Sequence, residues 1–206
     1  MNELPHGWTY SYEEMEKAFR LSKSFNDTDF INHIYSQINY LQFLGKSYSY
    51  WKLSDELKFS YIQNYLILFS SIIEALFDKI YREKLPWCNA NCQLKPGGVF
   101  SCSILENYYC SDKKKKYDCN RVIKFSFLIK MAYNDGLLDE VSETRINVLR
   151  EIRNNIHLTK IKKVGKEDEL ISVKTINSYI KDLKTIVKNI EKWNEENKNK
   201  CIKRLL

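Results

Sequence analysis

The chain has 206 residues, a formal net charge of +7 and 44% hydrophobic residues, a composition that is typical of a globular domain and excludes a disordered chain. No apolar run reaches the roughly 18 to 20 residues that a membrane span requires. The first ten residues, MNELPHGWTY, lack the basic and apolar regions of a secretory signal. We therefore expect a cytoplasmic protein without a membrane-spanning segment.

Apolar residues recur at helical spacing along most of the chain, and only six glycines and three prolines interrupt them. The pattern predicts helices over residues 12–22, 28–44, 54–84, 121–133, 142–159 and 172–195, with a tyrosine-rich loop at 46–51. Asp27 or Thr28 is expected to cap the second helix, and Gly45 to end it. The broad apolar stripe of 54–84 is typical of a central helix. We expect an all-α fold, a single domain over residues 1–206 built as a helical bundle of four to five main helices.

Residues 86–120 break the helical pattern, because this segment contains two of the three prolines and the pair Gly97–Gly98. We interpret it as an irregular insertion between helices. It also holds five of the six cysteines of the chain, namely Cys88, Cys92, Cys102, Cys110 and Cys119. Four of them could form a structural zinc site, which would stabilise a loop with little core. The spacing is not that of a common zinc knuckle, and the alternative is free cytoplasmic thiols.

The segment REIRNNIHL, residues 150–158, places a polar stripe on an otherwise amphipathic helix. At about 100° per residue, Arg150, Arg153, Asn154 and His157 fall within an arc of about 100°, next to the apolar face of the same helix. Arginine presents a fixed fork of donors to a phosphate, and histidine transfers protons near neutral pH. Together they could cleave a phosphodiester bond in RNA without a metal, with His157 as general base. The alternative is a solvated face with a histidine at the helix end.

The residues LREIRNNIHLTK, 149–160, resemble the signature of HEPN domains, in which an arginine, four to six residues and a histidine follow one another. Arg150 and His157 match this spacing, with six residues between them. Arg153 is followed by the polar residue that the signature often has, Asn154, but only three residues separate it from His157. The pattern is therefore divided between two arginines. Residues 64–81 and 127–158 also resemble the long central helix and the helical hairpin of this family.

The resemblance implies a small helical bundle that acts as a metal-independent ribonuclease of the toxin or phage-defence type, with no cofactor. It also implies a homodimer in which two motif helices face each other across a cleft that binds RNA. An antitoxin or a nucleotidyltransferase is a further partner to be tested. The family contains inactive members, so the alternative is a non-catalytic module that binds RNA, a nucleotide or a protein.

Glu74 is the one carboxylate within the apolar run 65–77 of the long helix, and a charge in such a place should be paired. We predict that it holds Arg150 or Arg153 in position. The alternative is that Glu74 points into a solvated groove.

Overall fold

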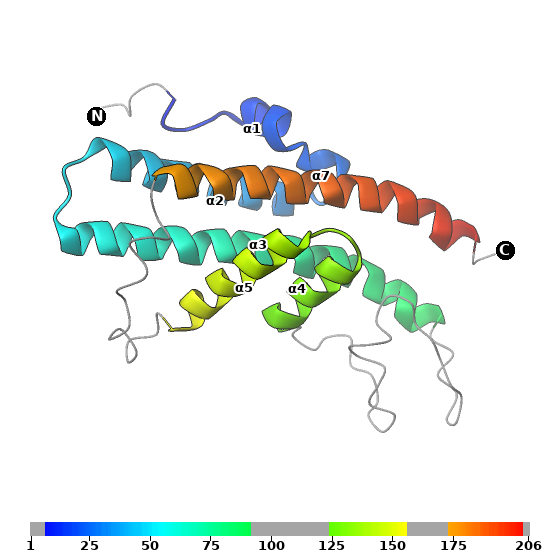
Figure 1. Cartoon of the computed structure of the whole chain (residues 1–206). Helices are drawn as coiled ribbons and strands as arrows, with labels where there is room; N and C mark the ends of the chain where they lie inside the picture. Colours follow the sequence, from blue (N-terminus) through cyan, green and yellow to red (C-terminus); the bar gives the residue numbers. More distant parts are fainter. Residues whose placement is uncertain (1–6, 92–123, 156–172, 204–206) are drawn as a thin grey trace.

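The computed structural model describes residues 7–91, 124–155 and 173–203, and within these ranges the fold is all-α, without a strand (Figure 1). The prediction of an all-α fold is thereby confirmed. The helices are α1 (Tyr12–Phe19), the short 3-10 helix η1 (Leu21–Lys23), α2 (Thr28–Tyr50), α3 (Asp55–Asn91), α4 (Phe125–Asn134), α5 (Glu140–Asn155) and α7 (Val173–Lys203).

The predicted end of the second helix at Gly45 and the predicted tyrosine-rich loop at 46–51 are both wrong, because α2 continues through this glycine to Tyr50. Asp27 caps the start of α2 as expected, with its side chain accepting a hydrogen bond from the Phe30 backbone N–H at 3.0 Å. A glycine inside a helix costs only about 1 kcal/mol. Leu44 and Ser47 are both buried on either side of it, so packing against the rest of the bundle outweighs the local preference.

The central and last helices are longer than the pattern predicted. Helix α3 extends to Asn91, so residues 86–91 of the predicted insertion are helical, and residues 92–120 lie outside the described part of the chain. Helix α7 extends to Lys203, eight residues beyond its predicted end at 195.

Helix α3 is the central element of the bundle, as its broad apolar stripe predicted. Helices α2 and α7 lie on one side of it, and the hairpin of α4 and α5 lies on the other (Figure 1). Its side chains Phe69, Ile73, Leu76 and Phe77 are at most 1% exposed. Because α3 buries residues toward both sides, one continuous core joins the two layers.

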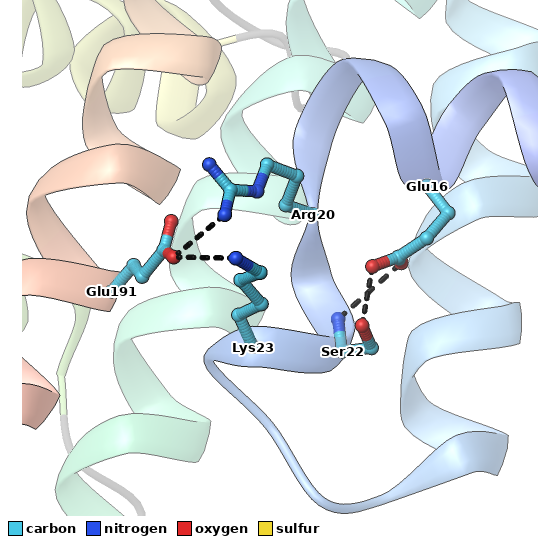
Figure 2. A network of polar contacts seen from close by, with 5 residues as sticks. All are labelled: Glu16, Arg20, Ser22, Lys23 and Glu191. Atoms are coloured by element: carbon cyan, nitrogen blue, oxygen red, sulfur yellow. Dashed lines mark hydrogen bonds and ion pairs between the residues drawn. The ribbon is translucent and has the colours of Figure 1, made fainter.

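The N-terminal corner, residues 12–24, places Met15, Phe19 and Leu21 in the core and is also held to the bundle by polar contacts. Ser11 and Glu14 form a reciprocal capping box at the start of α1. At the other end Arg20 has a φ of 54°, a left-handed conformation that turns the chain into η1. The Glu16 carboxylate accepts hydrogen bonds from the Ser22 hydroxyl and backbone N–H (Figure 2). It also accepts one from the Tyr35 hydroxyl of α2.

Helix α7 holds the same corner from the opposite side. Its Glu191 carboxylate receives Arg20 Nη2 at 3.4 Å and Lys23 Nζ at 3.8 Å (Figure 2). Asn194, one turn further along α7, donates to the Ser24 carbonyl oxygen at 2.8 Å. The corner is therefore fixed to α2 and to α7 by several independent contacts.

Among the described helices none combines the length and the apolar composition that crossing a bilayer would require.

Candidate functional site

The turn between α4 and α5, residues 135–139, sets the start of the helix that carries the polar stripe. Gly136 has a φ of 73°, which a side chain would strain. The Tyr81 hydroxyl of α3 donates to Asp135 at 2.9 Å, and Asn189 of α7 donates to the Leu137 carbonyl oxygen at 3.0 Å. Asp139 then caps α5 by accepting the Ser142 backbone N–H at 2.7 Å. Both layers of the bundle thus hold this turn.

Helix α5 presents one apolar face to α3, as its periodicity predicted. Ile146 and Leu149 are 3% and 1% exposed, and Ile152 packs against the same core. The polar residues of the stripe consequently lie beside this face, at the border between the core and the surface.

An ion pair that the sequence analysis missed joins α5 to α7. Arg145 Nη2 donates to Asp182 Oδ1 at 2.8 Å. Burial raises the pKa of the Asp182 carboxyl, and the Arg145 guanidinium opposes this shift only in part. Both residues occur in ordinary polar positions of amphipathic helices, so their spacing in the sequence gave no signal that they would meet.

The predicted pairing of Glu74 with one of the two arginines is present in the structure, and the arginine is Arg153. Its Nη1 donates to the Glu74 carboxylate, across a sequence separation of 79 residues. The two side chains are 32% and 28% exposed, so the pair lies at the edge of the interface between α3 and α5. A charged hydrogen bond in such a half-buried place restrains the arginine more firmly than solvent would.

Arg150, one turn before Arg153, has different surroundings. Its Nη2 lies 3.5 Å from the carboxylate of the exposed Glu151, which is its only ion-pair partner among the residues that the structure describes. Its Nε is buried and has no hydrogen-bond partner there. With 25% of its side chain exposed, Arg150 is partly open to an external group, although its buried Nε is not.

Of the other two residues of the predicted site, the structure describes Asn154 but not His157. Asn154 is exposed on α5, on the turn that also carries Arg150 and Arg153. His157 falls in the range 156–172 and lies outside the described residues. The structure thus brings Glu74 and Arg153 together and leaves Arg150 beside them, separated from Arg153 by one helical turn.

Four of the five cysteines of the predicted zinc site lie outside the described residues. Cys92, Cys102, Cys110 and Cys119 lie in the range 92–123, and only the backbone of Cys88, within α3, is described. Elsewhere in the described ranges there is no group of three or more histidine, cysteine, aspartate or glutamate side chains that could hold a metal ion.

Comparisons of the chain with protein-family models, with curated proteins and with solved structures give no match, so no relative supports or contradicts the resemblance to HEPN domains.

Proposed function

We propose that the chain is a metal-independent endoribonuclease of the toxin or defence type, whose site is the polar stripe of α5. In this proposal Arg150 binds the scissile phosphate and His157 is the general base. Arg153 and Glu74 are positioning residues that fix α5 against α3. A homodimer with the two stripes facing each other would supply a cleft with doubled positive charge for an RNA strand.

The observation that carries the proposal is the unequal state of the two arginines. The Arg153 charge is already matched by Glu74, whereas Arg150 is partly exposed with a weak partner in Glu151. Arg150 also has the six-residue spacing from His157 that the HEPN signature allows. Both observations support Arg150, rather than Arg153, as the residue that binds the phosphate.

The reaction uses these side chains and a proton donor for the leaving group. His157 takes the proton of a ribose 2′-hydroxyl, and the 2′-oxygen attacks the adjacent phosphorus. The bond from phosphorus to the 5′-oxygen breaks, and that oxygen takes a proton from water or from a group of the second subunit. The products are a 2′,3′-cyclic phosphate and a 5′-hydroxyl. Arg150 stabilises the charge that develops on the phosphate oxygens.

The test is incubation of the purified chain with total RNA in EDTA, followed by end-group analysis of the products. We expect His157→Ala to reduce the cleavage rate by about 10² to 10⁴ and Arg150→Ala by about 10² to 10³. Arg20→Ala is the matched control, because it removes the same charge from the N-terminal corner. Cleavage that persists in both His157→Ala and Arg150→Ala would refute the catalytic roles.

The second candidate is a module that binds RNA without cutting it. It is favoured by the ion pair of Arg153, which leaves one guanidinium instead of two for the phosphate. Binding of RNA by the wild type that weakens in Arg150→Ala, with no cleavage in EDTA or with magnesium, would establish this alternative.

A further inference from the structure

A cavity of about 520 Å³ lies on the other side of α3 from the stripe of α5. The segment before α1, the second half of α2, and single residues of α3 and α7 line it. This volume is within the range of small-molecule sites in proteins. Tyr65 of α3 lines the cavity, nine residues before Glu74, so the two sites are about 13 Å apart along the same helix.

Aromatic rings form much of the wall. Trp8 and Tyr10 come from the segment before α1, Tyr50 from the end of α2 and Tyr65 from α3. The Trp8 and Tyr50 rings meet edge to face with their centroids 5.4 Å apart. Such rings offer flat apolar surfaces against which another aromatic ring packs favourably.

The wall that Trp8 and Tyr10 provide is fixed in place by Asn39 of α2. The Asn39 side chain accepts a hydrogen bond from the Tyr10 backbone N–H and donates one to the Tyr10 carbonyl oxygen, both at 2.9 Å. Gly7 precedes this segment with a φ of 83°. The chain therefore forms a defined rim above the cavity, held by a reciprocal pair of hydrogen bonds.

Two polar side chains of the lining have capacity for a ligand. Gln42 Oε1 is buried and accepts no hydrogen bond within the described part of the protein. A buried acceptor without a donor is costly, and a ligand N–H would remove that cost. The Lys46 ammonium lies 5.1 Å from the centroid of the Tyr10 ring and forms no ion pair with a described carboxylate, so it can receive an anion.

Gly45 lies between these two side chains on the lining. A glycine inside a helix lowers its stability, and α2 continues through it nonetheless. Gly45 has no side chain and therefore contributes only backbone atoms to the cavity wall.

We propose that this cavity binds a small planar aromatic acid that carries an N–H donor. The ring packs among Trp8, Tyr10 and Tyr50, the N–H donates to Gln42 Oε1, and the acidic group pairs with Lys46. Purine nucleotides and indole-type carboxylic acids share this chemistry. The proposal does not depend on the ribonuclease activity, because no residue of the α5 stripe takes part in it.

The test is isothermal titration calorimetry of the full chain with adenosine 5′-monophosphate, with indole-3-acetate and with ribose 5-phosphate. We expect saturable binding of at least one of the two aromatic acids and none of ribose 5-phosphate. Tighter binding of adenosine monophosphate identifies a nucleotide site, and tighter binding of indole-3-acetate identifies a site for aromatic carboxylates.

Three variants locate the binding. Lys46→Met removes the ammonium and is expected to weaken binding about 10-fold or more, because it deletes a charge-assisted contact. Gln42→Met removes the unsatisfied acceptor, so it should weaken binding while the melting temperature holds or rises. Lys188→Met on α7, an exposed lysine outside the cavity lining, is the matched control and should change neither.

Three outcomes would overturn the proposal. They are an absence of binding of both aromatic acids at millimolar concentration, equal binding of ribose 5-phosphate, and unchanged affinity in both Lys46→Met and Gln42→Met. Circular dichroism of each variant verifies that the helical fold is retained, and Gln42→Met keeps the test decisive if Lys46→Met does not fold.

Discussion

Two carboxylates on core helices, Glu74 of α3 and Glu191 of α7, each receive cations from a neighbouring element, yet the two regions are built differently. Glu191 is contacted by two residues that are about half exposed, Arg20 and Lys23. The N-terminal corner that they belong to is also held by Glu16, Tyr35 and Asn194. Among the described residues, Glu74 receives a single guanidinium, that of Arg153.

The N-terminal corner is held by several polar contacts, whereas, within the described ranges, α5 is held to α3 by one. The corner has several polar contacts, so the removal of one exposed ion pair should lower the free energy of unfolding only slightly. The described C-terminal half of α5 is joined to α3 by apolar packing and by one ion pair, which lies beside the predicted phosphate ligand Arg150. We expect the ion pair of Glu74 with Arg153 to orient the polar stripe of α5 relative to α3.

The largest expected effect concerns the apolar contribution to the α5 region. Leu149 is 1% exposed, so Leu149→Ala should lower the free energy of unfolding by about 2 to 5 kcal/mol. Met15→Ala in the corner, where Met15 is also 1% exposed, is the matched variant. Urea unfolding measures both. A loss below about 1 kcal/mol for Leu149→Ala would contradict the packing of α5 on α3.

The next effect is the coupling between Glu74 and Arg153. A double-mutant cycle with Glu74→Gln and Arg153→Gln should give a coupling of about 1 kcal/mol, since both side chains are close to a third exposed and solvent screens the pair. The same variants should lower RNA cleavage less than Arg150→Ala does. Additive effects on the free energy of unfolding would remove Glu74 from its positioning role.

An intermediate effect is expected from acid at the corner. Burial raises the pKa of Glu16, but hydrogen bonds from Ser22 and Tyr35 outweigh it, so the folded pKa lies below the ordinary value of 4.5. The stability that Glu16 contributes is therefore present above pH 4.5 and is lost as the pH falls toward the folded pKa.

Urea unfolding at neutral pH and at about pH 3.5, which is below the ordinary glutamate pKa, measures this contribution. The difference in stability between the wild type and Glu16→Gln should shrink in acid. Glu13→Gln, on the exposed side of α1, serves as the control for the removal of one carboxylate from the same helix. A difference for Glu16→Gln that stays constant would show that its hydrogen bonds do not favour the ionised form.

The smallest effect is expected at Glu191. A cycle of Glu191→Gln with Arg20→Gln should give a coupling of at most about 0.5 kcal/mol, because both cations are half exposed and the other contacts of the corner remain. A coupling larger than that of Glu74 with Arg153 would reverse the comparison between the two regions.

Helical periodicity predicted most of the fold, because long apolar stripes such as that of α3 leave few alternatives to a central helix. It misplaced the end of α2, since tertiary packing of Leu44 and Ser47 overrides the local preference of Gly45. The left-handed conformation of Arg20 and the short helix η1 after it are accompanied by contacts with α2 and α7. No local pattern in the sequence predicts this turn.

The candidate site was predictable where a residue conflicted with its surroundings. Glu74 interrupts an apolar stripe, so the sequence indicated a partner, and the structure supplies Arg153. Arg145 and Asp182 sit on polar faces where charges are ordinary, so nothing marked them. Trp8 and Tyr10 lie in a segment without periodicity, and only the contact with Asn39 shows that they enclose a cavity.

Helix α3 is one continuous helix of 37 residues, about 55 Å long, and it carries both Tyr65 and Glu74. Because the helix is unbroken between them, the cavity wall at Tyr65 and the ion pair of Glu74 with Arg153 keep a fixed spacing of about 13 Å along one element. The placement of both regions therefore depends on how this one helix packs in the bundle.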